Sequence, residues 1–221
     1  RFLMGAGGSQ IVSPSGEILA RGPLDEEAVV FAELDLSQAD NKLRPDGTHL
    51  FAARRPELYA PIVARPSAPI CKTAAEAVTV VCLSPVAEDE NALDELAELV
   101  ASLPEDTALA VLPELFCYGN APGPDLAEDV SLGQRAIAAM QEACLGRADL
   151  VLCASLVLPV DDRFALVAVL VNTAGVVATQ CQLHHCKRHE WSAVGDKLQP
   201  VDLPWGRVFL FAGDDTVHPE L

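Results

Sequence analysis

Positive charge is scarce in this sequence of 221 residues. It has 15 Lys and Arg against 32 Asp and Glu, a formal net charge of −17, and no run of Lys or Arg is longer than two residues. A surface with this excess of negative charge repels nucleic acid phosphates and anionic lipid headgroups. We therefore expect no nucleic acid partner and no membrane partner.

Long apolar runs and disulfide patterns are missing as well. No apolar run reaches the roughly 18 residues that would span a bilayer. The number of cysteines is odd and no two form a Cys-x-x-Cys pair, which favours reduced thiols over a disulfide framework. The seven are Cys71, Cys82, Cys117, Cys144, Cys153, Cys181 and Cys186. The chain starts at Arg1 without an initiator Met or an apolar signal segment, so we expect a cytoplasmic protein and a piece of a longer chain.

Apolar residues are abundant, although aromatic residues are few. Half of the chain is hydrophobic and 5% is aromatic. A chain of this length buries about 70% of the surface that its unfolded state exposes, which argues against intrinsic disorder and allows one large or two small domains.

The first part of the sequence is predicted to be β-rich. Residues 8–20 indicate a hairpin around a Pro-Ser-Gly turn, and residues 28–34 indicate another short strand. The segment 54–69 contains four prolines and no periodic pattern. It is therefore interpreted as an extended arm or linker.

From about residue 77 the pattern changes to strands that alternate with helices. The spacing of apolar residues predicts a helix over 91–103, and the capping box at 131–134 predicts the start of a second. Strands are expected at 78–83, 107–112, 150–157, 165–172, 176–180 and 207–213. This order predicts an α/β fold in which helices cover a sheet of mixed direction.

Three segments of this second part carry candidate chemistry. Glu114 follows an apolar strand, at the end where open α/β sheets place catalytic groups. Lys187 lies beside His189 and Glu190, and the strand ending near Gly213 leads into a sharp turn like a nucleophile elbow, but without a nucleophile. Taken singly, a solvated loop acid or helix-start acid is the preferred interpretation for Glu114, and a surface charge cluster is the preferred one for Lys187.

In their order, these segments resemble the nitrilase, or carbon–nitrogen hydrolase, superfamily. In that family a strand ends in Pro-Glu-Leu/Phe, a Lys-x-His motif follows a hairpin, and a strand ends in a Cys-Tyr/Trp-Asp/Glu-x-x-x-Pro-Glu elbow. The matching stretches here are Pro113-Glu114-Leu115, Lys187-Arg188-His189 and Gly213-Asp214-Asp215-Thr216-Val217-His218-Pro219-Glu220. The resemblance implies a four-layer α-β-β-α sandwich, incomplete in this chain, that hydrolyses amides or nitriles without a cofactor, often in dimers or larger assemblies.

The resemblance also assigns roles to residues. Glu114 would be the general base and Lys187 would stabilise the developing negative charge, so these two side chains are expected within a few ångströms of each other. The position of the family's nucleophilic Cys is occupied by Gly213, which cannot form a covalent intermediate. Asp214 and Asp215 of the elbow are candidate substrate-binding residues.

Glu190 and the other thiols leave alternatives open. Glu190 is a further candidate for substrate binding, in place of a Glu that family members carry between the Lys and the elbow, although a surface position in a shortened loop is favoured. Cys117 and Cys186 lie close in sequence to Glu114 and Lys187, and either could line the same crevice. Packing is the preferred interpretation for both, because free Cys is usually buried as a small hydrophobe. The cluster of His184, His185 and His189 lacks the ligand spacing of a zinc site, so no metal is expected.

Residues 1–66 resemble the closing part of the same family, ahead of its opening part. We interpret residues 1–66 as the C-terminal segment of a first nitrilase-like domain, 67–76 as a linker and 77–221 as the N-terminal part of a second domain. A circular permutation is the alternative, but the segment that follows the elbow in the family is found at neither end. The stretch Arg54-Arg55-Pro56-Glu57-Leu58-Tyr59 is the best candidate for a contact with another part of the assembly.

Two functions follow from these interpretations. The first is a carbon–nitrogen hydrolase acting on a small amide or nitrile, whose active site is completed elsewhere in a larger protein. The second is a pseudoenzyme domain that serves dimerisation, ligand sensing or support of an active partner domain, as a homo-oligomer or beside a second nitrilase-like domain. The absence of Cys at position 213 favours the second for the domain that begins near residue 77.

Overall fold

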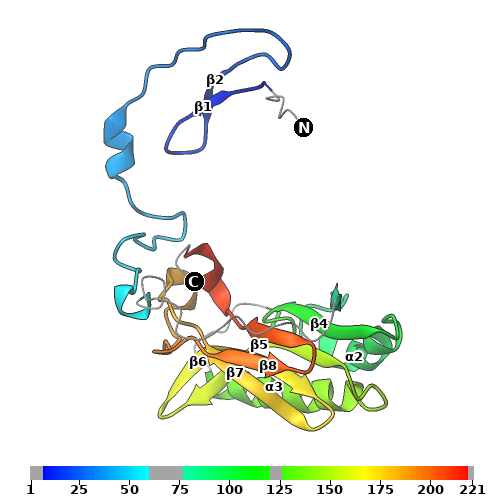
Figure 1. Ribbon diagram of the computed structural model, residues 1–221. Coiled ribbons are helices and arrows are strands. Elements are labelled where there is room, and N and C mark those ends of the chain that lie inside the picture. The colour runs from blue at the N-terminus through cyan, green and yellow to red at the C-terminus, as the bar shows by residue number, and fades with distance from the viewer. Residues whose placement is uncertain (1–6, 60–76, 120–125, 219–221) are drawn as a thin grey trace, which may run out of the picture. The chain divides into compact units, whose positions relative to one another are not determined.

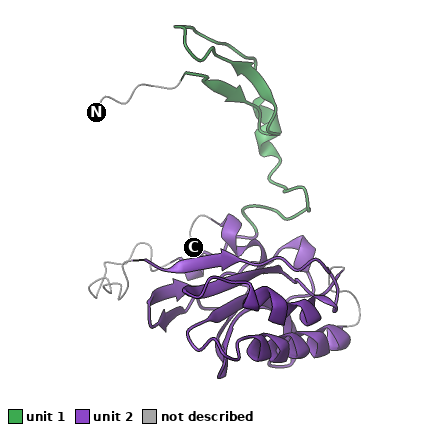
Figure 2. Cartoon of the chain, turned by 90° about the vertical axis from the view of Figure 1, so that its right-hand side faces the viewer, with its two compact units in different colours: residues 1–52 green, residues 53–221 purple. Residues whose placement is uncertain are grey.

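The computed structural model describes residues 7–59, 77–119 and 126–218, which group into two compact units, 1–52 and 53–221 (Figures 1 and 2). The predicted linker at 67–76 lies outside the described residues. Residues 53–59, assigned by the sequence to the first segment, belong to the larger unit. The proposed tandem arrangement stays a prediction.

The smaller unit contains the predicted hairpin. β1 (Gln10–Val12) pairs antiparallel with β2 (Ile18–Arg21), and a 3-10 helix, η1 (Leu36–Asp40), follows. The strand predicted at 28–34 is wrong, because these residues form no strand. Val29 and Phe31 are exposed there, so burial does not hold the segment extended.

The larger unit is built on a five-stranded mixed sheet in the order β3-β4-β5-β6-β7. The first three strands are parallel and the last three antiparallel. Their bounds are β3 (Thr79–Cys82), β4 (Thr107–Glu114), β5 (Val151–Val160), β6 (Arg163–Asn172) and β7 (Gly175–Cys181). The predicted mixed α/β fold is therefore confirmed.

Two helices and a second hairpin complete the larger unit. The helices are α2 (Ala92–Ala101) and α3 (Leu126–Ala143), and the hairpin is β8 (Pro200–Leu203) with β9 (Gly206–Phe209). Three 3-10 helices are η2 (Pro56–Leu58), η3 (Lys187–His189) and η4 (Gly213–Val217). The sequence did not predict β8, and it placed the end of the last strand four residues too late.

The start of the second helix was also misplaced. Ser131 lies inside α3, whose described part begins at Leu126. The acidic residues Glu128 and Asp129 stand in its first turn, where the positive end of the helix dipole favours negative charge. Residues 131–134 therefore do not begin a helix; they lie inside a longer one.

Both faces of the sheet are covered, which explains its long apolar strands. Along β6, Val167, Val169 and Val171 face the helices, while Leu166 and Leu170 join a second cluster with residues of the β8–β9 hairpin. Alternate side chains of a strand point to opposite faces, so a strand covered on both sides is apolar throughout.

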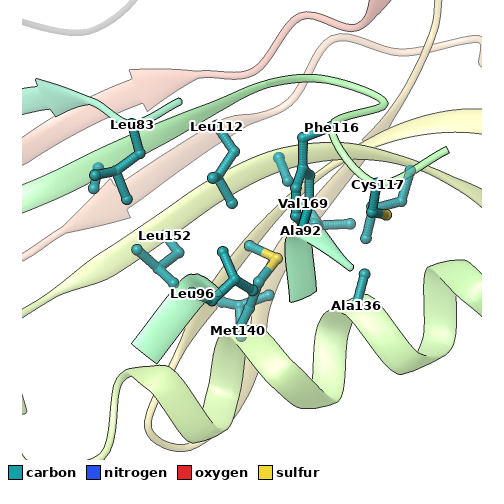
Figure 3. Packing of buried hydrophobic residues seen from close by; sticks show 14 of the residues in the cluster. Leu83, Ala92, Leu96, Leu112, Phe116, Cys117, Ala136, Met140, Leu152 and Val169 are labelled. Carbon is teal, nitrogen blue, oxygen red and sulfur yellow. The ribbon is translucent and has the colours of Figure 1, made fainter. Parts of the chain in front are cut away.

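The core on the helix side is closely packed. Figure 3 shows Met140 and Ala136 of α3 and Leu96 of α2 below the sheet residues Leu112 and Leu152. All five belong to one cluster of buried side chains. This packing holds β4 in place, and β4 ends at Glu114.

Gly133 tests how closely α3 lies against the sheet. A Cβ atom at this position would be 2.4 Å from the backbone oxygen of Val157 and 2.8 Å from Oη of Tyr118. Gly to Ala inside a helix usually stabilises by about 1 kcal/mol. Here we expect Gly133→Ala to lower the free energy of unfolding by about 1 to 3 kcal/mol, because the helix must move away from β5. Unfolding in urea measures this change in the free energy of unfolding. Ser131→Ala, on the exposed side of the same helix, is the matched control and should be neutral or slightly stabilising; the same result for Gly133→Ala would contradict this packing.

Candidate functional site

Glu114 is aimed by an irregular end of β4. The pairing of β4 with β5 shifts register between Val111 and Glu114, and Glu114 pairs with Ser155. The next residue, Leu115, has φ 53°, a left-handed conformation that is uncommon for a non-glycine residue. Its N–H donates to the carbonyl oxygen of Ser155 at 3.2 Å. The strand thus ends in a sharp turn that fixes the carboxylate at the sheet edge.

The carboxylate of Glu114 binds two cationic groups from η3. Nε2 of His189 lies 3.1 Å from Oε1, and Nη2 of Arg188 lies 3.3 Å from Oε2. Arg188 also reaches Oδ1 of Asp214, at 2.8 Å, so one guanidinium bridges the end of β4 and the elbow. The motif 187–189 and Glu114 therefore come together in space, through Arg188 and His189.

These contacts shift the acidities of both partners. Burial raises the pKa of Glu114, but the hydrogen bond from His189 and the charge of Arg188 outweigh it, so the pKa lies below the usual value. Burial lowers the pKa of His189, but interactions with Cys186 and Glu114 outweigh it and raise the pKa to about 9. His189 is thus a cation at neutral pH, although only 2% of it is exposed.

Gly213 is the first residue of η4 and has φ 59°. A Cβ atom there would lie 3.0 Å from Cδ2 of Leu166, 3.1 Å from Nδ1 of His189 and 3.2 Å from Cδ of Gln182. The turn has the left-handed backbone of an elbow. A side chain at this position would require these neighbours to move by a few tenths of an ångström.

The two other elbow candidates have different surroundings. Asp214 is buried and pairs with Arg188. Asp215 is fully buried, and its oxygens accept the backbone N–H groups of Leu183 and His184 at 2.9 to 3.0 Å. Oδ1 of Asp215 also lies 3.0 Å from Nδ1 of His184. The Asp215 carboxylate therefore fastens η4 to the segment that follows β7.

His184 extends this contact to the arm. Its Nε2 lies 2.8 Å from the hydroxyl of Tyr59, and its ring stacks on that of His218 with centroids 3.7 Å apart. Arg55 donates from Nη1 to the carbonyl oxygens of Leu183 and Gly195. Residues 55 and 59 thus contact the segment 183–195 of the same unit, and the predicted contact of residues 54–59 with another part of the assembly stays a prediction.

Lys187 and Glu190 pair with each other at 2.7 Å, and both are exposed. The residues that sequence reasoning missed are Arg188, Gln182 and the His184–Tyr59 pair. Arg188 stands inside the Lys-x-His motif, at the position where any residue is allowed, so the pattern carried no signal for it. Gln182 and His184 gain their roles only from the fold of the segment after β7.

Across residues 7–59, 77–119 and 126–218, no three His, Cys, Asp or Glu residues are grouped so that they could hold a metal ion. No helix among them is both long and apolar enough to cross a bilayer.

The comparisons with known proteins show the fold. No protein-family model matches the chain, and no curated protein matches it in sequence. Among solved structures, an amidase from Nesterenkonia sp. superposes with a TM-score of 0.52 at 17% identity, over 66% of this chain and 58% of that one. A mutant of the Nesterenkonia AN1 amidase, described as a nitrilase-superfamily member, gives 0.51 at 17% identity, over 63% and 57%. A double mutant of this amidase in complex with acrylamide gives 0.52 at 17% identity, over 64% and 57%.

The chain therefore has a partial nitrilase-like α/β fold and spans a little under three fifths of the length of these amidases. The expected fold class is confirmed at this level.

The role of Asp215 can be tested by stability. Asp215→Ala leaves the N–H groups of Leu183 and His184 buried without their acceptor. Breaking such a buried interaction on one side costs about 3 to 5 kcal/mol, and we expect a loss of that size in urea unfolding. Asp202→Ala is the matched control, because Asp202 pairs with Arg207 in solvent. It should change stability hardly at all, and equal effects of the two substitutions would rule out the proposed role of Asp215.

The charge of His189 can be tested by titration. We expect its imidazole signal in NMR spectra to titrate with a midpoint near pH 9. In Glu114→Gln the midpoint should fall toward the ordinary value of 6.5. Because the folded-state pKa is the raised one, the stabilisation from this pair is complete below 6.5 and lost as pH rises through about 9. The signal of His49, in the other unit, should not respond to the substitution, and an unchanged midpoint for His189 would contradict the pairing.

Proposed function

We propose that residues 77–218 form a carbon–nitrogen hydrolase-type unit of the nitrilase superfamily that does not hydrolyse amides or nitriles through its elbow. The observation that carries the proposal is Gly213. It stands at a left-handed turn, next to the bonded pair of Glu114 and His189, with no side chain to attack a substrate. The nitrilase-like fold and the three sequence motifs support the family assignment.

Without a side chain at Gly213, the elbow cannot carry out the covalent step of the reaction. A hydrolase of this type needs a thiolate that attacks the electrophilic carbon and a carboxylate that moves protons. Removing the nucleophile of an enzyme that works through a covalent intermediate costs on the order of 10⁶ in rate. Glu114 is moreover held by two cations, and its lowered pKa makes it a weaker base.

The use proposed for this unit is support of a partner domain. Residues 1–66 resemble the closing part of a first nitrilase-like domain, whose own triad would precede Arg1. Arg55 and Tyr59, within the described part of the arm, bond the segment 183–195 of the larger unit. We propose that this arm couples the two domains of a tandem protein, and that any hydrolysis of a small amide or nitrile belongs to the first. Lys187, Glu190 and Asp214 would line the corresponding, inactive site, and the fully buried Asp215 would hold its elbow turn in place.

The test is hydrolysis of a simple amide. The 221-residue chain is incubated with acetamide and the released ammonia is measured, beside the Glu114→Gln variant. We expect the two proteins to be indistinguishable from buffer, because neither has a thiol at position 213. Ammonia release by the wild-type chain that Glu114→Gln abolishes would overturn the proposal.

A further inference from the structure

Cys186 is the thiol closest in the chain to the paired groups of the site. It directly precedes η3 and is 4% exposed. Its sulfur accepts a hydrogen bond from Nε2 of Gln182 at 3.4 Å. Its carbonyl oxygen accepts the N–H of His189 at 3.3 Å, and this bond closes the turn of η3.

Two buried polar atoms beside this thiol make no hydrogen bond with the described residues. They are Nδ1 of His189 and Oε1 of Gln182, in side chains at most 2% exposed. Both side chains also border the place of the missing side chain of Gly213. Buried polar atoms in proteins are seldom left without a partner, and such an exception calls for an explanation such as a redox role or a small polar molecule.

We propose that Cys186 is a modification site at which hydrogen peroxide oxidises the thiol to a sulfenic acid, with His189 as proton donor and Gln182 as the acceptor for the peroxide O–H. The ligand class follows from size and polarity. A thiol that is 4% exposed favours a small oxidant over bulky electrophiles. A peroxide both donates and accepts hydrogen bonds, which matches an imidazolium N–H and an amide oxygen.

The reaction balances with the groups present. The thiolate sulfur of Cys186 attacks one oxygen of the peroxide, an S–O bond forms and the O–O bond breaks. The departing hydroxide takes the proton from His189 and leaves as water. Sulfur is oxidised, the peroxide is reduced, and the products are a sulfenic acid, water and a neutral imidazole. No hydrolysis at position 213 is involved, so the inference goes beyond the proposed function and does not rest on it.

The electrostatics of the site support the thiolate. Burial raises the pKa of Cys186, but the interactions with the neighbouring His189 and the hydrogen bond from Gln182 outweigh it and bring the pKa below its usual value. His189 is itself held as a cation by Glu114 from β4, while Arg188 from η3 and Asp214 from η4 complete the charges around that carboxylate.

Other cysteines of the unit lack such support. Burial raises the pKa to about 12 for Cys117 and to about 11 for Cys144 and Cys153. Cys82 is exposed. The chain therefore contains its own references, an exposed thiol and buried thiols whose pKa is raised.

The experiment treats the full chain with hydrogen peroxide at pH 7, quenches it at intervals and measures the oxygen gained at each cysteine by peptide mass spectrometry. We expect Cys186 to gain oxygen before the exposed Cys82. We also expect His189→Gln to slow the oxidation of Cys186 about tenfold or more, because the thiolate and the proton donor are both lost. Cys153→Ser is the matched control and should leave the rate at Cys186 unchanged.

A second variant keeps the test decisive if His189→Gln fails to fold, which circular dichroism shows. Glu114→Gln leaves Cys186 and His189 in place and removes the anion that holds the imidazolium. It should slow oxidation of Cys186 severalfold at pH 8. Faster oxidation of Cys82 than of Cys186 would overturn the proposal. So would a rate at Cys186 in folded His189→Gln or in Glu114→Gln that equals the wild-type rate. Oxygen gain is read independently of ammonia release, so a failure here and a failure of the proposed function are distinguishable.

Discussion

The buried carboxylate of Asp215 fixes the two segments between which the site lies. Its oxygens accept backbone N–H groups of Leu183 and His184 and the side chain of His184, so the elbow turn cannot move away from the segment that follows β7. Gln182 directly precedes these residues and Cys186 follows them. A buried anion is tolerated because several donors replace its lost water, and that requirement sets the path of the chain around it.

The second layer of organisation is the charge network at the end of β4. In the order of their contacts, Asp214, Arg188, Glu114 and His189 alternate between negative and positive charge. Each charged group therefore lies next to one of opposite sign. At this partly buried end of the sheet, such contacts shift pKa values. Paired charges with shifted pKa values thus lie beside an elbow in which Gly213 occupies the position of the nucleophile. Our two proposals rest on this combination: no hydrolysis at that position, and activation of a neighbouring thiol.

Much of the fold could be predicted from the sequence, because the local sequence patterns agree with the tertiary packing. The apolar runs of β5 and β6 and the amphipathic α2 were predicted within a few residues, since each has a periodicity that burial enforces. The incorrect predictions fall on segments whose secondary structure is decided by tertiary packing and not by the local sequence. The apolar residues at 28–34 imitate a strand but find no burial, and Ser131 imitates a cap inside a helix that extends further toward the N-terminus.

The sequence by itself determined the α/β class, the position of Glu114 at a strand end and the absence of a thiol at Gly213, because these depend on residue identity and local periodicity. Only the tertiary structure decided which cations bind Glu114, that Asp215 fastens the elbow to Leu183 and His184, and that Cys186 lies beside His189. These contacts join residues 26 to 75 positions apart, or depend on a turn such as η3 that has no periodic signature. Their geometry exists only when the strands that carry them are packed together.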